Sequence, residues 1–427
     1  MGALGPALHA AHVAVALAAV FLIAWLGRSV ARLLRQPDVI GEIAAGLLAG
    51  PAALALLGSG PFHAVLPQGV LDTLKFVGQA GLVLFLVGLA RHMRTGPNSP
   101  PRRSTLWVSA GALVPPLLCG VVLAGWVIAS HDVTVRGTAP LPAFVLMTAV
   151  SMSISAVPVM ARILTARRME NSAAGTITMA SAIVIDAVGW LLLTVAISLA
   201  SGSPDGLLHS MRALVLGLVC ALAIRYSLCS RGARNLCRRA PRWAATLLGA
   251  SALVVAISME HLGMTAILGA ALVGFSIPTG KSTPWEQAVA SVSRVGRVLV
   301  PAFFVVTGIM VFNRPFSAVP WAIIALAIML GVLGKGLGGY AGARLGGQPR
   351  DVSIRIGVLM NTRGLTELVV LQAGYSAGIL TTPLVLALVV MALTTTAMTG
   401  PLLSYLDRVS QQSLRMPQQE HSQHRTI

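Results

Sequence analysis

Long apolar runs separated by short polar connectors make up most of the chain. Each run has a length that suits one membrane crossing, since about 20 apolar residues span the hydrocarbon core of a bilayer. The runs begin near His12, Val39, Gly69, Ser104, Leu141, Ser172, Leu208, Arg242, Met264, Ala290, Ala318, Val352 and Pro383. This pattern predicts an all-α polytopic membrane protein of about 13 transmembrane helices. The predicted transmembrane domain covers residues 1–405, and a short tail follows over residues 406–427.

Arginines concentrate in every second connector. They cluster over residues 28–35 after the first run and over residues 231–239 after the seventh, whereas the intervening connectors hold almost none. Positive residues next to membrane helices remain on the cytoplasmic side. The sequence therefore predicts a multi-pass protein of the cell membrane with its N-terminus outside and its tail in the cytoplasm. The richness in arginine and alanine suggests a GC-rich bacterium.

Composition excludes an ordinary soluble protein. Hydrophobic residues make up 56% of the chain and charged residues only 10%, and the mean hydropathy is +0.81. A soluble domain would carry about 25% charged residues. The net charge of +18 lies in the connectors, so it indicates topology and the lipid bilayer as surroundings, with no nucleic-acid partner. Neither a catalytic triad nor a metal-binding cysteine or histidine motif is evident, and we expect no enzyme activity and no cofactor.

Asp186 is the most unusual residue of the apolar runs. It lies near the middle of the run over residues 172–200. A carboxylate at that depth costs on the order of 3 kcal/mol on insertion scales, and such residues face a cavity, a partner or an ion path. Asp186 is therefore a candidate ion-binding residue, with a structural carboxylate satisfied by neighbouring helices as the alternative.

Two runs carry residues that interrupt a helix. The fifth run contains three serines, including Ser153 and Ser155, followed by Pro158, and proline removes a backbone hydrogen bond. The twelfth run contains the polar stretch 361–364 and Glu367 at membrane depth. Such residues are tolerated where they line a cavity or are buried in protein. The two breaks are seven runs apart, which predicts opposite orientations, and matching interruptions in inverted repeats indicate a transporter's binding site.

Lys335 is a second charged residue inside a run. The chain has only three lysines and otherwise uses arginine, and a lysine can release its proton when buried. Lys335 is therefore a candidate counter-charge or proton carrier, with a structural ion pair or an interfacial position as alternatives. The glycines around it, between residues 331 and 339, predict close helix packing.

Two further carboxylates suggest structural ion pairs. Arg363 and Glu367 are four residues apart, so they share a face of a continuous helix and are expected to form a buried pair. Glu42 in the second run is expected to neutralise a nearby arginine and not to bind the transported ion.

These motifs resemble the second family of monovalent cation/proton antiporters, which contains bacterial sodium or potassium/proton exchangers and plant cation/proton exchangers. The similarity covers nearly the whole chain. It rests on PDVIGEIAAGLLAGP over residues 37–51, SISAVPVMARIL with SAIVIDAVGW over 153–190, PAFFVVTGI over 301–309, and GVLMNTRGLTELVVL with VMALTTTAMTGPLL over 357–403.

The resemblance implies two inverted repeats with two unwound helices that cross near an essential aspartate. Asp186 falls on the family's cation- and proton-binding aspartate, and Lys335 falls on its core-domain lysine. The crossing would include Ala156, Val157, Pro158, Asn361, Thr362, Arg363 and Glu367. The resemblance also implies exchange of a monovalent cation (Na+ or K+) for protons by alternating access, and a homodimer.

The chain departs from the family pattern at Ile185. The family usually has an acid or asparagine there, which in acidic members pairs with the lysine, so Lys335 could instead pair with Asp186. We expect Asp186 to bind either a proton or a cation, with the hydroxyls of Ser153 and Ser155 among the other oxygens. Because Ile185 leaves no second titratable group beside Asp186, we expect one proton to be exchanged for each cation, which makes the exchange electroneutral. The alternative is a relative that does not exchange ions: a sensor, an accessory or biosynthetic membrane protein, or an organic-solute transporter on the same fold.

Overall fold

The computed structural model of the chain is helical throughout the part that it describes. The described residues are 6–34, 36, 38–57, 67–95, 101–201, 205–262, 266–278, 284–311 and 321–423. Two of the predicted run starts, Met264 and Ala318, lie outside these residues. The absence of strands in the described part agrees with the predicted all-α class, because backbone groups in a bilayer must be satisfied within a helix or a closed barrel.

The helices of the first half are α1 (Pro6–Leu33), α2 (Asp38–Leu57), α4 (Gln68–Thr95), α5 (Arg102–Ala129), α6 (Val133–Arg136), α7 (Leu141–Ser153), α8 (Val157–Ala166) and α9 (Ala173–Ser201). Those of the second half are α10 (Asp205–Cys229), α11 (Arg231–Arg239), α12 (Pro241–His261), α13 (Ala266–Ser276), α14 (Trp285–Val311), α15 (Trp321–Val332), the π-helix η1 (Leu333–Leu337), α16 (Gly338–Leu345), α17 (Arg350–Met360), α18 (Leu365–Ser376) and α19 (Thr382–Gln423).

Nine helical stretches in the described part are long and apolar enough to cross a membrane, counting α7 with α8 and α15 with α16 as single spans. A tenth is possible if α10 and α11, which meet at a bend of 65°, form one span. The remaining expected crossings fall on a short apolar stretch of α2, on the 11-residue helix α13 and on the interrupted pair α17 and α18. The count of about thirteen therefore stays a prediction.

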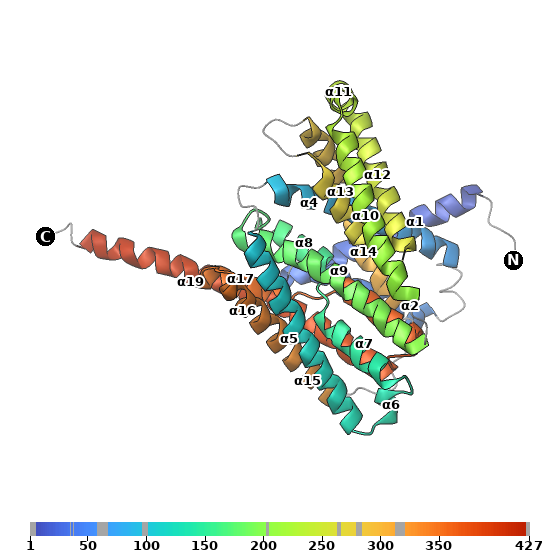
Figure 1. Cartoon of the computed structure of the whole chain (residues 1–427), viewed down its shortest axis with the longest axis vertical. Coiled ribbons are helices and arrows are strands. Elements are labelled where there is room, and N and C mark those ends of the chain that lie inside the picture. Colours follow the sequence, from blue (N-terminus) through green and yellow to red (C-terminus); the bar gives the residue numbers. More distant parts are fainter. Residues whose placement is uncertain are drawn as a thin grey trace.

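The helices form two groups. The contact between α4 and α14 is at the centre of one group, and the contact between α5 and α16 is at the centre of the other. In the α4–α14 group, α14 packs against α2 and α4, while α1, α12 and α13 pack around them. In the α5–α16 group, α5 packs against α7 and α16, with α9, α15, α17 and α19 alongside. Figure 1 shows α10, α12 and α13 gathered at the upper end of the molecule and α5, α7 and α15 at the lower end.

The contacts repeat in a pattern expected of two structural repeats. The contact of α2 with α14 corresponds to the contact of α13 with α4, and the contact of α5 with α7 corresponds to that of α16 with α17. In the same way, the contact of α8 with α9 corresponds to that of α18 with α19. This matching relates α1–α9 to α12–α19, as predicted from the spacing of the two breaks. The half-helices α8 and α18 touch each other and also contact α4 and α14, so they lie between the two groups.

Glycines bring the central helices of the α5–α16 group together. A Cβ atom on Gly111 would lie 2.3 Å from the carbonyl oxygen of Gly338, and one on Gly338 would lie 2.1 Å from that of Gly111. Only residues without a Cβ allow two membrane helices to approach this closely. The packing role predicted for the glycines near Lys335 is therefore confirmed at Gly338. It is wrong for Gly336, where a Cβ would meet nothing within 4 Å.

Helix α19 runs without interruption past the expected boundary between the transmembrane domain and the tail at residues 405 and 406. In Figure 1 its last turns project away from the other helices toward the C-terminus.

Candidate functional site

The first break interrupts the helix in the fifth run. Helix α7 ends at Ser153, residues 154–156 are not helical, with Ile154 extended, and α8 begins at Val157 with Pro158 in its first turn. Proline is tolerated there because the first amides of a helix have no intrahelical partner. Pro158 thus starts the second half-helix, and the last carbonyl groups of α7 are left without helical partners.

The second break lies directly against the first. Helix α17 ends at Met360, and α18 begins at Leu365 after residues 361–364. A Cβ atom on Gly364 would lie 2.4 Å from Val159 Cγ2 and 3.2 Å from Ala156 Cβ. The hydroxyl group of Thr366 donates to the carbonyl oxygen of Ser155 at 3.1 Å. The structure therefore brings the two interrupted runs together.

Arg363 joins the two breaks through its guanidinium group. Its Nη2 atom donates to the carbonyl oxygen of Met152 at 2.7 Å, and its Nη1 atom lies 3.4 Å from that of Ser151. These are carbonyl groups freed by the end of α7, where the helix dipole is negative. The same Nη1 donates to Glu367 Oε1 at 3.2 Å, and both side chains are fully buried. The ion pair predicted from the spacing of Arg363 and Glu367 is confirmed.

Thr396 of α19 holds the backbone of Arg363. Its hydroxyl oxygen accepts from the Arg363 amide at 2.8 Å and lies 2.7 Å from the Arg363 carbonyl oxygen. Sequence reasoning did not single out Thr396 or Thr366. Three consecutive threonines inside an apolar run, residues 394–396, were the available signal.

Lys335 reaches the first break from the second half of the chain. It lies in η1, and a π-helical turn inside an α-helix often marks a functional position. Its side chain is fully buried, and its ammonium group donates to the hydroxyl oxygen of Ser155. The charges of Arg363 and Glu367 act on it from the second break.

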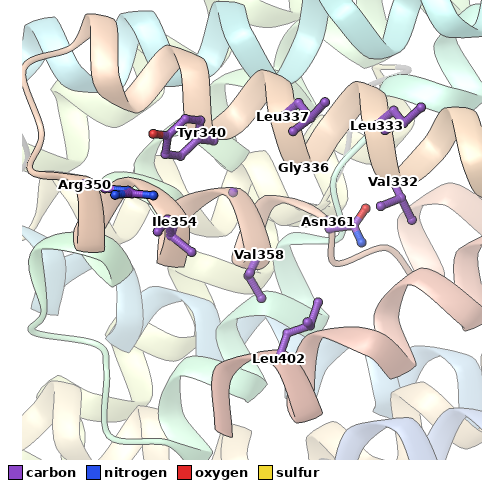
Figure 2. A pocket seen from close by; sticks show the side chains of 11 residues that line it. Val332, Leu333, Gly336, Leu337, Tyr340, Arg350, Ile354, Val358, Asn361 and Leu402 are labelled. Carbon is purple, nitrogen blue, oxygen red and sulfur yellow. The ribbon is translucent and has the colours of Figure 1, made fainter. Parts of the chain in front are cut away.

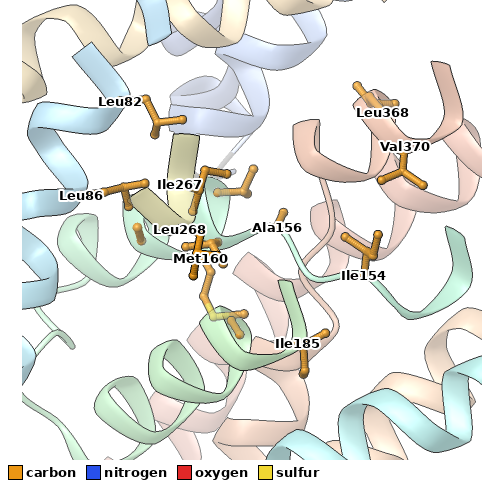
Figure 3. Packing of buried hydrophobic residues seen from close by; sticks show 14 of the residues in the cluster. Leu82, Leu86, Ile154, Ala156, Met160, Ile185, Ile267, Leu268, Leu368 and Val370 are labelled. Carbon is orange, nitrogen blue, oxygen red and sulfur yellow. The ribbon is translucent and has the colours of Figure 1, made fainter. Parts of the chain in front are cut away.

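Asp186 is buried on α9 with 1% of its surface exposed. Gly189 lies three residues further on and so on the same face of α9. A Cβ atom on Gly189 would lie 2.8 Å from Ile154 Cγ1, so this face points toward the first break. Ile185 is fully buried and packs in the apolar cluster that also contains Ile154, Ala156 and Met160 (Figure 3).

The predicted site residues are all buried. Ser153 donates to the carbonyl oxygen of Val150 at 3.0 Å, and Thr362 donates to that of Leu359 at 2.6 Å, each within its own helix end. Asn361 directly follows α17, and it lines a cavity that is described below. The buried residues are Ser153, Ser155, Ala156, Val157, Pro158, Asp186, Lys335, Asn361, Thr362, Arg363 and Glu367.

Lys335, Arg363 and Glu367 lie together at the two breaks, Asp186 is buried on the α9 face that points toward the first break, and the formal charges of the four groups cancel. Asp186 and Glu367 are acids, Lys335 and Arg363 are bases, and none is more than 1% exposed. Charged groups inside a membrane are costly unless they are balanced by partners or bind an ion. A balanced set can take up one additional positive charge, either as a proton or as a monovalent cation, at a carboxylate.

Glu42 links the broken run to the α4–α14 group. Its Oε1 atom lies 3.4 Å from Arg162 Nη2 of α8 and 3.5 Å from Arg28 Nε of α1. The Glu42 carboxylate is fully buried. Its predicted role as a partner of a nearby arginine is confirmed, and the structure adds a second arginine that belongs to the half-helix α8.

Comparison with known proteins identifies relatives over most of the chain. The family described as "Sodium/hydrogen exchanger, transmembrane" matches residues 17–406. The Na(+)/H(+) antiporter NhaS4 of Synechocystis is 29% identical over 380 residues, which are 86% of this chain and 90% of that protein. Cation/H(+) antiporter 17 of Arabidopsis thaliana is 30% identical over 87% of this chain but only 45% of its own length, so the chain spans about half of the plant relative.

A solved structure supports the fold. The sodium proton antiporter MjNhaP1 of Methanocaldococcus jannaschii superposes with a TM-score of 0.63 over 94% of this chain and 97% of the other, at 17% sequence identity.

We expect Glu367→Ala to destabilise the protein by about 3–5 kcal/mol, because it leaves the buried Arg363 without its acid partner. The control is Asp38→Ala, which breaks a 2.8 Å pair with Arg32 whose side chains are 29% and 67% exposed and should cost less than about 1 kcal/mol. The free energy of unfolding in mixed micelles measures both. Equal losses would show that Arg363 does not depend on Glu367.

The contact between the breaks predicts that Gly364→Ala destabilises the protein by about 1–3 kcal/mol, because its Cβ would overlap the buried Val159. Adding Val159→Ala removes the overlapping methyl groups and should recover part of the loss. Gly125→Ala on α5, whose Cβ meets nothing within 4 Å, is the control and should be neutral or stabilising. The midpoint of thermal unfolding in detergent reports each effect, and a loss unchanged by Val159→Ala would contradict the contact.

Proposed function

The chain belongs to the sodium/hydrogen exchanger family, and we propose that it exchanges Na+ or K+ for protons across the cell membrane by alternating access. The observation that carries this proposal is the meeting of two interrupted helices beside a buried aspartate. Interrupted helices at matching places of two repeats form the substrate sites of many secondary transporters. The names of relatives include both Na(+)/H(+) and K(+)/H(+) antiporters, so both cations remain candidates.

Asp186 is the residue at which the two ligands compete. A proton or a dehydrated cation neutralises its carboxylate, and oxygen atoms around it replace the hydration shell of the cation. Ser153 and Ser155 lie in the adjacent break, and their hydroxyl oxygens retain lone pairs beyond the bonds described above. Lys335 acts on this site through Ser155, either as a fixed counter-charge or as a proton carrier.

The charge balance supports electroneutral exchange. With Asp186, Glu367, Lys335 and Arg363 ionised, the buried set has no net charge. Loading a proton or a monovalent cation at Asp186 gives the same net charge of +1 in both cases. Ile185 contributes no second titratable group at this position. One proton therefore moves for each cation, and the two loaded states cross the membrane with equal charge.

The proposed motion carries the α5–α16 group past the α4–α14 group. The contact between them near the first break is apolar and includes Leu86 and Ile267, which Figure 3 shows close to the first break. Together with Val157 they line a cavity of only about 10 Å³. Such a gap holds no more than about one water molecule. An apolar contact without directional bonds supports sliding and also keeps ions from leaking past the site.

We further propose that the chain lies in the cell membrane of a bacterium as a homodimer, with the N-terminus outside and α19 ending in the cytoplasm. The alternation of arginine-rich connectors supports this orientation. The large apolar side chains left exposed on α1 and α10, including Leu22, Trp25 and Leu222, suit contact with lipid or with a second copy.

We expect everted vesicles that contain the protein to show cation-dependent recovery of a pH-gradient dye on addition of Na+ or K+, and we expect Asp186→Asn to abolish it. Asp72→Asn makes the same chemical change at an exposed carboxylate of α4 and should retain activity. Both variants are compared at matched expression. Lack of response from correctly inserted wild type to Na+, K+, Li+ and ammonium across a range of pH would favour the non-exchanging alternative.

Electroneutral exchange predicts that the transport rate in proteoliposomes does not change when a membrane potential is imposed at a fixed pH gradient. The potential can be set with valinomycin and K+ when Na+ is the exchanged ion, or with a permeant anion when K+ is exchanged. A strong dependence of the rate on potential would mean that more than one proton moves per cation.

A further inference from the structure

A groove opens on the outer face of the α5–α16 group, behind the ion site. It has a volume of about 390 Å³ and lies between α15, η1 and α16 on one side and α17 and α19 on the other (Figure 2). Its walls are mainly apolar and are formed by Val332, Leu333, Leu337, Ile354, Val358 and Leu402. Leu333 and Leu337 are 46% and 61% exposed, so the groove communicates with the surface that faces the bilayer.

Two glycines give the groove its shape. A Cβ atom on Gly336 would meet nothing within 4 Å, so the space beside this residue is open and belongs to the groove. A Cβ atom on Gly357 would lie 2.7 Å from the Gly336 carbonyl oxygen, which shows how closely α17 approaches η1 at the floor. The missing side chain of Gly336 thus leaves space open in the groove, and the close approach of α17 to η1 at Gly357 limits the groove on that side.

One end of the groove is cationic. Figure 2 shows Arg350 and the hydroxyl group of Tyr340 at the same end, while Asn361 closes the other. Arg350 starts α17 and is exposed, and within the described part of the chain neither its side chain nor that of Tyr340 makes a hydrogen bond or ion pair. The N-terminus of α17 adds a partial positive charge. Asp351, the acid beside Arg350, is exposed and does not line the groove.

We propose that this groove binds one anionic phospholipid, with its phosphate at Arg350 and Tyr340 and an acyl chain along the apolar walls. The occupant of an open apolar groove on a membrane-facing surface comes from the bilayer, and the free guanidinium and phenol groups select an anionic head over a zwitterionic one. Arg350 follows a connector predicted to be cytoplasmic, and anionic lipids are enriched in the cytoplasmic leaflet.

The acyl chain of the bound lipid would lie directly behind the ion site. Gly336 follows Lys335 in η1, and Asn361 begins the break that contains Arg363. A lipid in the groove therefore holds the π-helical turn and the second break in place. Any effect on transport rests on the proposed exchange function, whereas binding itself can be measured without transport.

Native mass spectrometry of the purified full chain with phosphatidylglycerol or phosphatidylcholine tests the proposal. Wild type should retain one phosphatidylglycerol in preference to phosphatidylcholine. Gly336→Leu, which fills the groove, should lose this lipid, whereas Gly125→Leu, at an exposed glycine of α5 with equal free space, should keep it. Arg350→Gln should weaken retention about fivefold, and Arg103→Gln, at an exposed arginine of α5, should not.

A photoactivatable phosphatidylglycerol added to wild type gives a test that does not depend on the folding of a variant. Crosslinks should map to peptides of α16 and α17. Equal retention by Gly336→Leu and Gly125→Leu, or crosslinks confined to other helices, would overturn the site. Equal retention of the two lipids, unaffected by Arg350→Gln, would overturn the selection of an anionic head. Retained lipid binding in a chain without exchange activity would refute the proposed function and leave this inference standing.

Discussion

The guanidinium group of Arg363 at the broken end of α7 is the interaction on which the site depends. A helix that stops inside a membrane leaves carbonyl groups that no water can satisfy, and each unmet group costs several kcal/mol. Arg363 satisfies two of them, at Ser151 and Met152, and its charge opposes the negative end of the helix. Because Arg363 itself belongs to the second break, each interrupted helix supplies hydrogen-bond partners to the other.

The same interaction determines which charges the site can tolerate. Arg363 brings a positive charge to a region without solvent, and Glu367 balances it from the next turn of α18. Lys335 and Asp186, both buried, are the other base and acid of the four ionisable groups described here, so the formal charges of the set cancel. An acid at position 185 would have added a second negative charge, whereas Ile185 packs in the apolar cluster instead. The apolar residue is thus consistent with a site that carries a single exchangeable charge.

The sequence predicted the parts of this arrangement that depend on neighbouring residues. Pro158 and the polar stretch 361–364 located the two breaks, and the spacing of Arg363 and Glu367 predicted their ion pair. The contacts from Arg363 to α7 and from Lys335 to Ser155 join residues more than 170 positions apart. No local pattern specifies such contacts, because they depend on how two repeats pack. For the same reason the groove beside Gly336 could not be distinguished from close glycine packing.

The two repeats match in their contacts but differ in charge at the interface between the helix groups. Half-helix α8 is tied to α2 through Arg162 and Glu42. The counterpart of α2 in the second repeat is α13, which contains no charged residue over its length from Ala266 to Ser276. The proposed sliding of one group past the other would stretch the Arg162–Glu42 pair, and α13 offers no charged residue to replace it. The two end states of that proposed motion would therefore differ in energy, although the two repeats match in their contacts.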